Sequence, residues 1–198
     1  MAIPLAKRDG IKTPTFRTSN PGSAADPSKP HLILVGLPGS GKTTVGQAVA
    51  DRTGRTFLDL DQEIERREGR SISQIFGEKG EPYFRKRERE LTEELAMFGN
   101  MIVSPGGGWI TDPETVGLVR PPSMLVYLKV RPDIALKRLG PLRMMRPLLS
   151  RPNPLDELTR LLEARKAAYE SADLVVNTEL LDLQRVIEKV IELASAGR

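Results

Sequence analysis

The sequence contains no cysteine and only one histidine, His31. Without cysteine the chain can form neither a disulfide framework nor a cysteine-ligated zinc site, and this usage is typical of a reducing compartment. A single histidine excludes a histidine-based metal cluster, and it excludes any Ser-His or Cys-His catalytic pair that does not use His31 itself. No run of about 18 apolar residues is present, and no apolar secretory core stands near residue 1. We therefore expect a cytoplasmic protein without a membrane partner.

Positive charge is concentrated at the beginning of the chain. The chain has 30 basic and 26 acidic side chains, which give a formal net charge of +4. Five of the basic and two of the acidic ones lie in the first 30 residues, so residues 31–198 carry 25 basic and 24 acidic side chains. This near neutrality excludes a nucleic-acid-binding surface by charge. The first 30 residues also contain five prolines and almost no apolar periodicity. We predict a disordered extension over residues 1–30, with a targeting role as the weaker alternative, and one domain over residues 31–198.

Short apolar runs alternate with helical patterns from residue 31 onward. Strands are predicted at 32–35, 56–60, 101–104, 124–130 and 174–177. Helices are predicted at 43–52, 62–68, 71–76, 82–98, 113–120, 132–139, 155–172 and 181–196. This alternation predicts an α/β fold with a parallel sheet flanked by helices on both faces. Ligands of such sheets bind at the carboxyl ends of the strands.

The segment Gly36-Leu37-Pro38-Gly39-Ser40-Gly41-Lys42-Thr43 matches the P-loop pattern in full, between a predicted strand and a predicted helix. Its backbone N–H groups hold phosphate oxygens, and the following helix presents its positive end to the same anion. Lys42 reaches the β- and γ-phosphates, and the hydroxyl of Thr43 binds Mg²⁺. The segment predicts a nucleoside triphosphate site, and it does not show which acceptor is phosphorylated.

Two carboxylates, Asp59 and Asp61, close the second predicted strand. Alternation along a strand places both on one side, close to the P-loop. One can hold Mg²⁺ through its water shell, and the other can accept a proton from an attacking hydroxyl. The structural alternative is that Asp61 caps the following helix.

Several later residues have both a functional and a structural interpretation. Arg85 opens a long helix and can pair with Glu88 three residues on. Three glycines, Gly106, Gly107 and Gly108, follow the third strand, and they indicate either a ligand or a tight turn. Trp109 after them is predicted to pack in the core, with the wall of a pocket as the alternative.

Three arginines complete the set of candidates. Arg138 and Arg146 flank a segment that we predict to be a mobile lid at about 139–154, whose arginines would meet a transferring phosphoryl group. The alternative is a solvated loop. Arg165 on the next helix is either a surface charge or a clamp for a carboxylate.

Taken together, these segments resemble the shikimate kinase family of P-loop small-molecule kinases. The matching segments cover essentially all of residues 31–198 in the expected order: the P-loop, Asp59-Leu60-Asp61, Gly80-Glu81 with Phe84-Arg85 and Glu88, Gly106-Gly107-Gly108, Arg146-Pro147-Leu148-Leu149, and Arg165 with Tyr169. The resemblance implies a P-loop kinase fold with a central five-stranded parallel sheet and a mobile lid. It also implies that MgATP and shikimate give shikimate 3-phosphate and ADP, in aromatic amino-acid biosynthesis.

The resemblance also implies a role for each candidate residue. Lys42, Asp61 and Arg146 would be catalytic. The nucleotide would be bound by Gly39, Ser40, Gly41, Lys42, Thr43, Thr44, Arg138 and Arg146. Shikimate would be bound by Asp61, Arg85, Gly106, Gly107, Gly108 and Arg165, and Mg²⁺ by Thr43 directly and Asp59 through water. We expect a monomer whose partners are ATP and shikimate.

Three other functions compete with this interpretation. A P-loop kinase for another small polyol acid, such as gluconate, would share the nucleotide site, but Phe84-Arg85 and the three glycines favour shikimate. A nucleoside monophosphate kinase would need a base-recognition pocket that the sequence does not show. A nucleotide-binding regulatory module would have no need for the proton acceptor that Asp61 provides.

Overall fold

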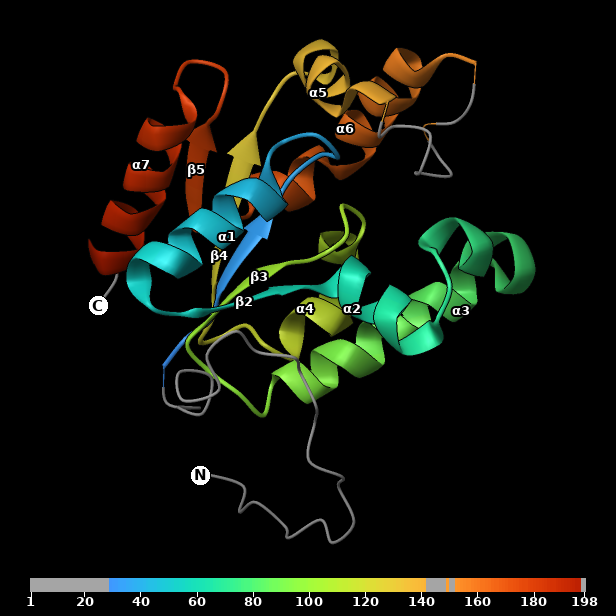
Figure 1. The fold of residues 1–198 in the computed structure, drawn as a ribbon, viewed down its shortest axis with the longest axis horizontal. Coiled ribbons are helices and arrows are strands. Elements are labelled where there is room, and N and C mark those ends of the chain that lie inside the picture. Colours follow the sequence, from blue (N-terminus) through green and yellow to red (C-terminus); the bar gives the residue numbers. More distant parts are fainter. Residues whose placement is uncertain (1–28, 142–148, 150–151, 197–198) are drawn as a thin grey trace, which may run out of the picture.

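The computed structural model describes residues 29–141, 149 and 152–196. Five strands form one sheet in the order β2-β3-β1-β4-β5 (Figure 1). The strands are β1 (Leu32–Val35), β2 (Thr56–Asp59), β3 (Met101–Ser104), β4 (Met124–Lys129) and β5 (Leu174–Asn177). All four neighbouring pairs are parallel, with β1 at the centre. The predicted five-stranded parallel sheet is therefore confirmed.

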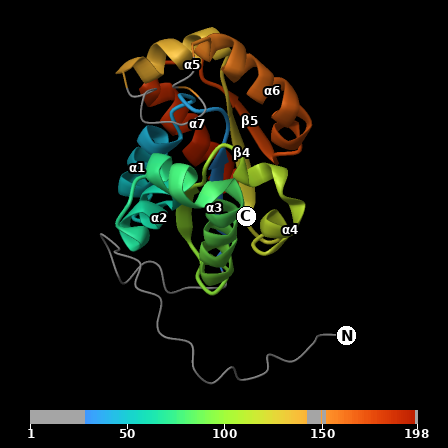
Figure 2. The ribbon, with the colours of Figure 1, turned by 90° about the vertical axis from the view of Figure 1, so that its right-hand side faces the viewer.

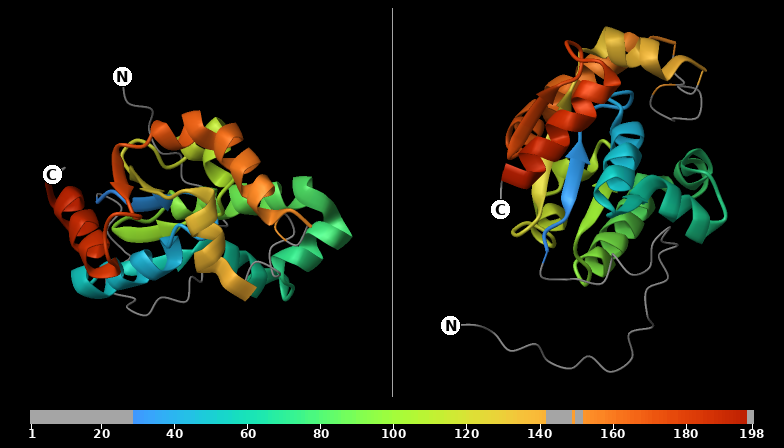
Figure 3. Two further views of the ribbon diagram at one scale, coloured as in Figure 1. Left: turned by 90° about the horizontal axis from the view of Figure 1, so that it is seen from above. Right: turned by 60° about the vertical axis from the view of Figure 1, so that its left-hand side comes forward.

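Helices cover both faces of this sheet. They are α1 (Lys42–Thr53), α2 (Leu60–Glu68), α3 (Ile72–Leu95), α4 (Pro113–Gly117), α5 (Pro132–Leu139), α6 (Pro154–Glu170) and α7 (Leu183–Ala196), with a 3-10 turn η1 (Trp109–Thr111). Successive side chains of β1 point to opposite faces, and two separate apolar clusters result. Leu32 and Leu34 pack in the cluster of α1 and α7, and Ile33 and Val35 pack in the cluster of α3 and α6. Figure 3 shows α1 and α7 on one side of the strands and α6 on the other.

Capping residues set several helix ends where the sequence pattern places them. Ser71 and Gln74 form a capping box at the start of α3. Gly69 ends α2 in the left-handed conformation. Gly54 ends α1 in the same way, since a residue without a Cβ adopts this conformation at low cost.

The two helices predicted at 71–76 and 82–98 are present as two helical segments of α3, which meet at a kink. Gly80 separates the segments with φ 80° and ψ 168°, and Pro82 follows two residues later. Glycine and proline usually end a helix, which is why the sequence predicts a break. Here the helical pattern resumes directly, because proline is tolerated in the first turn of the second segment.

In Figure 2, α5 and α6 lie together above α2 and α3.

Some predicted features lie outside the described residues. The extension over 1–30 falls there except for its last two residues, and so does most of the predicted lid, including Arg146. Among the helices that are described, none combines the length and the apolar character needed to cross a membrane.

Candidate active site

A cavity of about 840 Å³ opens at the carboxyl ends of the strands, where the fold predicts a ligand. It is lined by almost every residue that the sequence singles out: Gly39, Ser40, Gly41, Lys42, Thr43, Thr44, Asp59, Asp61, Arg85, Gly106, Gly107, Gly108, Arg138 and Arg165. Arg146 lies outside the described residues. The structure therefore brings together residues from the P-loop, the end of β2, the helices α1, α2, α3, α5 and α6, and the glycine segment that follows β3.

The P-loop has a conformation that glycine permits. Gly39 and Gly41 have φ values of 84° and 96°, and a Cβ on Gly39 would lie 2.4 Å from the carbonyl oxygen of Ala135. Lys42 is buried, and its Nζ donates to the carbonyl oxygens of Gly36 and Leu37 at 3.0 and 3.1 Å. Helix α1 begins at Lys42 with no side-chain cap, so its first N–H groups face the cavity as an anion site.

Asp59 has two contacts at the junction of β2 and α2. Its Oδ2 accepts a hydrogen bond from Thr43 Oγ1 at 2.8 Å, and its Oδ1 accepts one from the backbone N–H of Gln62 at 3.2 Å. Asp59 is thus the N-cap of α2, and the suggested cap role of Asp61 is wrong. The strand ends at Asp59 because this cap starts the helix at Leu60. Asp61 therefore belongs to α2 and not to β2, so strand alternation does not place the two carboxylates on one side. Both nevertheless line the cavity.

The three glycines make room for the side chains of the site. None of them has a positive φ, so no left-handed turn requires them. A Cβ on Gly106 would lie 2.8 Å from Asp61 Oδ1, and a Cβ on Gly108 would lie 2.6 Å from Arg85 Nη2. A Cβ on Gly107 would lie 3.1 Å from Arg165 Nη1. Of the two interpretations of this segment, the structure favours close approach by functional groups.

This close approach yields a first prediction. Gly106→Ala is expected to displace Asp61, because the new methyl group would also lie 3.1 Å from Glu88 Oε1 on its other side. A displacement of about 1 Å in a reacting group costs on the order of 10²-fold in rate. Steady-state turnover of the variant measures this loss. The matched control is Gly117→Ala in α4, where a Cβ meets nothing within 4 Å. Equal activities for the two variants would contradict the assignment.

Arg85 is held between two carboxylates of its own helix. Its Nη1 donates to Glu88 Oε2 at 2.6 Å, and its Nη2 donates to Glu81 Oε1 at 3.0 Å. The predicted pairing of Arg85 with Glu88 is thus confirmed. Glu88 itself is only 3% exposed, and its pKa is raised to about 7. Burial is the main cause, the charge of Asp61 contributes to the rise, and Arg85 opposes it. Sequence analysis noted Glu88 only as a partner of Arg85 and did not predict a buried carboxyl group beside Asp61.

The raised pKa of Glu88 predicts how stability depends on pH. Between the ordinary carboxyl pKa and about 7, folded chains bind a proton at Glu88 that unfolded chains release. This contribution to the free energy of unfolding is complete at low pH and is lost as pH rises through about 7. Relative to the Glu88→Gln variant, the free energy of unfolding of the wild type is expected to fall by up to about a few kcal/mol between about pH 5 and about pH 8. Urea denaturation of both proteins at several pH values measures the difference, and parallel pH profiles would contradict the prediction.

Helix α6 supports the glycine segment from the other side. The hydroxyl of Tyr169 donates to the carbonyl oxygen of Gly107 at 2.8 Å, and its ring stacks on that of Tyr127 with centroids 5.0 Å apart. Arg165, one turn earlier on α6, reaches the space above Gly107. Arg85 and Arg165 therefore approach neighbouring glycines with their guanidinium groups, an arrangement suited to a carboxylate.

Two other predicted residues have defined surroundings. Arg138 donates to the hydroxyl and the carbonyl oxygen of Thr178 at 2.8 and 2.7 Å, at the end of the cavity that Leu181 and Leu183 line. Trp109 is buried and its Nε1 donates to Thr92 Oγ1 at 3.0 Å. The prediction that Trp109 packs in the core is confirmed.

Comparison with known proteins gives a consistent result. The family model for shikimate kinase matches residues 38–195. Shikimate kinase from Caldicellulosiruptor saccharolyticus is 36% identical over 166 residues, covering 84% of this chain and 96% of that protein. Shikimate kinase from Nitrosomonas europaea is 37% identical over 182 residues, covering 91% and 84%.

Solved structures agree with the sequence matches. The structure of shikimate kinase from Acinetobacter baumannii in complex with shikimate has a TM-score of 0.80 and 35% identity, covering 86% of this chain and 96% of that one. A gluconokinase from Sinorhizobium meliloti reaches a TM-score of 0.54 at 16% identity, which shows a shared fold alone. With this fold, this cavity and these matches, the chain belongs to the shikimate kinase family.

Proposed function

We propose that this protein transfers the γ-phosphoryl group of ATP to the 3-hydroxyl of shikimate, giving shikimate 3-phosphate and ADP in aromatic amino-acid biosynthesis. One observation carries the proposal: Asp61, Arg85 and Arg165 converge on the three glycines in the cavity that the P-loop also lines. A carboxylate acceptor and a triphosphate donor can thus lie side by side.

The nucleotide end of the cavity supplies positive charge to the phosphates. Backbone N–H groups of Gly39, Ser40 and Gly41 and the start of α1 would hold the β- and γ-phosphates. Lys42 would leave its two carbonyl partners and contact phosphate oxygens instead. Arg138, anchored on Thr178, would lie against the nucleotide. Arg146 is proposed to meet the transferring group.

The donor set beside the P-loop fits a magnesium ion. The hydroxyl of Thr43 and the carboxylate of Asp59 lie within 2.8 Å of each other, and Mg²⁺ prefers such oxygen ligands together with water. We assign Thr43 as the direct ligand and Asp59 as the partner of a metal-bound water. When bound, the ion would neutralise charge on the β- and γ-phosphate oxygens.

The acceptor end orients the hydroxyl and takes its proton. Arg85 and Arg165 would bind the shikimate carboxylate in paired hydrogen bonds, while Asp61 accepts a hydrogen bond from the 3-hydroxyl. The 3-oxygen then forms a bond to the γ-phosphorus as the bond from that phosphorus to the β,γ-bridging oxygen breaks. The hydroxyl proton passes to Asp61, and ADP carries away the bridging oxygen. Glu88 keeps Arg85 aimed at Gly108.

A kinase acting on another polyol acid, such as gluconate, is the alternative, and it shares the nucleotide site. An acceptor panel separates the two: ADP release from ATP is measured with shikimate, gluconate, a nucleoside monophosphate or no acceptor. We expect release only with shikimate. Release with gluconate alone would establish the alternative, and binding of ATP without release in any arm would indicate a nucleotide-binding module.

A further inference from the structure

Helix α3 contributes side chains to the cavity lining from both sides of its kink. Ile72 and Phe76 precede Gly80, Phe84 and Arg85 follow it, and all four line the cavity. With φ 80° and ψ 168°, Gly80 occupies a region of backbone space that is almost restricted to glycine. The angle between the two segments therefore sets how far Arg85 stands from Ile72 and Phe76. Contacts that bridge the kink can control this angle.

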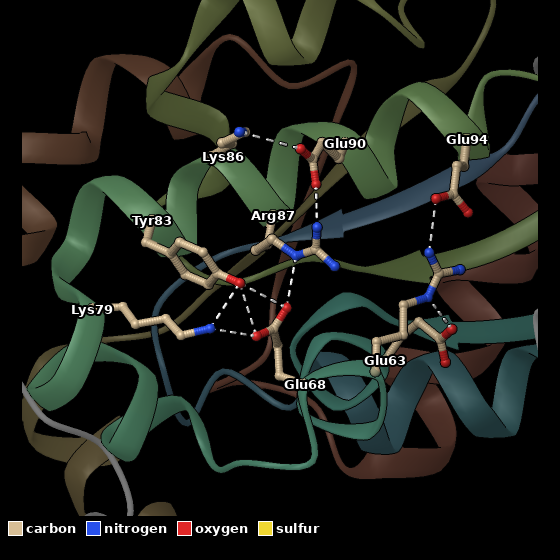
Figure 4. A network of polar contacts seen from close by, with 9 residues as sticks. Glu63, Glu68, Lys79, Tyr83, Lys86, Arg87, Glu90 and Glu94 are labelled. Atoms are coloured by element: carbon tan, nitrogen blue, oxygen red, sulfur yellow. Dashed lines mark hydrogen bonds and ion pairs between the residues drawn. The ribbon is translucent and has the colours of Figure 1, made fainter.

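One carboxylate makes such contacts. Glu68, the last residue of α2, accepts hydrogen bonds from Lys79 Nζ at 3.2 Å and from the hydroxyl of Tyr83 at 3.0 and 3.1 Å. Arg87 Nε lies 2.8 Å from Glu68 Oε1. Lys79 precedes Gly80, whereas Tyr83 and Arg87 follow it. Figure 4 shows all three donors directed at the one carboxylate. We call these four residues the Glu68 cluster.

The carboxylate of the Glu68 cluster is shielded from water, and the cluster is internally connected. The side chain of Glu68 is 8% exposed although it belongs to a surface helix. Lys79 Nζ also donates to the hydroxyl of Tyr83 at 2.9 Å and lies 4.1 Å from the centre of its ring. Burial acts to raise the pKa of Glu68, but the hydrogen bonds from Lys79 and Tyr83 and the charge of Arg87 hold it below its ordinary value. Glu68 therefore stays charged at neutral pH.

The position of the cluster connects it to the acceptor site. Tyr83 and Arg87 are four residues apart and share one face of α3. Arg85, midway between them in sequence, points to another face and lines the cavity. Fixing Tyr83 and Arg87 from outside thus fixes the rotation of the helical turn that presents Arg85 to Gly108.

We propose that Glu68 is a positioning residue of the acceptor site: by binding both sides of the Gly80 kink, it sets the direction of Arg85. This inference rests on the proposed function, since it assigns Arg85 to the acceptor. Glu68 is not among the residues that line the cavity, so it is not placed to contact substrate or nucleotide. Its loss should therefore weaken acceptor binding selectively.

Glu68→Gln tests the proposal, because it removes the charge and keeps the shape. The matched control is Glu90→Gln: Glu90 pairs with the same Arg87 at 2.6 Å but binds no residue before the kink. We expect Glu68→Gln to raise the KM for shikimate about tenfold, with kcat and the KM for ATP within about twofold of wild type. Glu90→Gln should match wild type in all three constants. Equal shikimate KM values for the two variants, or an equal loss of ATP and shikimate affinity, would overturn the proposal.

A second variant separates bridging from general packing. Lys79→Met removes the contact before the kink and leaves Tyr83 and Arg87 in place. It should raise the shikimate KM in the same direction. Combined with Glu68→Gln it should add less than its full effect, since both changes break the contact between Glu68 and Lys79, although Lys79→Met also removes the hydrogen bond to Tyr83. Fully additive effects would overturn the bridging role. Amide hydrogen exchange over residues 77–87, which needs no substrate, should be faster in Glu68→Gln than in Glu90→Gln; equal exchange would also contradict it.

Failure of the proposed function would be visible separately. Wild-type protein that releases no ADP with shikimate would contradict the proposed function. The variant comparison would then be made with the acceptor that the panel identifies, and with hydrogen exchange. A selective rise in the KM for that acceptor would support the role of Glu68 for the site as a whole.

Discussion

Lys42→Met is expected to abolish phosphoryl transfer while leaving the fold intact. Methionine has nearly the length of lysine but carries no charge to neutralise the β- and γ-phosphates. Removing one preorganised donor from a transition state typically costs on the order of 10²–10³-fold in turnover, and a charged donor on phosphate belongs at or above that range. The measurement is ATP- and shikimate-dependent ADP release under saturating conditions.

The control for this variant is a lysine of the same chain outside the cavity. Lys189→Met removes an exposed charge on α7, where the ammonium pairs loosely with Glu192 at 3.6 Å. It should keep wild-type turnover. Thermal unfolding of Lys42→Met should show one cooperative transition, although the carbonyl oxygens of Gly36 and Leu37 each lose a donor. Substantial turnover by a folded Lys42→Met protein would contradict the nucleotide site.

The second large effect is expected at the two carboxylates, where the proposed roles predict different phenotypes. Asp61→Asn removes the proton acceptor, and general-base contributions are about 10²–10⁴-fold, so turnover should fall at every Mg²⁺ concentration. Asp59→Asn should instead raise the Mg²⁺ concentration needed for half-maximal rate. Asparagine caps helices as well as aspartate does, so α2 should still begin at Leu60.

A magnesium titration at saturating ATP and shikimate distinguishes these outcomes. Excess Mg²⁺ should restore much of the rate of Asp59→Asn and none of the rate of Asp61→Asn. The reverse pattern would show that the roles are exchanged. Identical titrations for both variants would show that the two carboxylates act as one unit, contrary to the separate contacts of Asp59 with Thr43 and Gln62.

Local signals were sufficient for most of the fold. The strands at 32–35, 101–104 and 174–177 agree with β1, β3 and β5 at both ends, because apolar runs flanked by polar or turn-forming residues define them. The end of β2 and the start of α2 were misplaced because Asp59 acts as a cap, which depends on side-chain geometry. The break within α3 was predicted because Gly80 and Pro82 normally end a helix, but the short distance between its two segments was not.

The site was predictable where a motif carries its own chemistry. The P-loop, the two aspartates and the three glycines could be found in this way, and the structure gathers them in one cavity. Contacts between residues that are distant in sequence could not be found in this way. Glu88 becomes buried only when α3 packs beside Asp61, and Arg138 meets Thr178 across 40 residues. Periodicity gives no signal for a charged group that tertiary packing buries.

The single tryptophan gives the protein a built-in spectroscopic probe. Trp109 directly follows Gly108, is 1% exposed, and is hydrogen-bonded to Thr92 on the helix that carries Arg85. Thr92 in turn donates to the carbonyl oxygen of Glu88 at 2.8 Å. The indole therefore joins the glycine segment to α3 at the point where both meet the acceptor. Its emission comes from one site, without contributions from other tryptophans, and we expect it to change when the proposed acceptor binds at this end of the cavity.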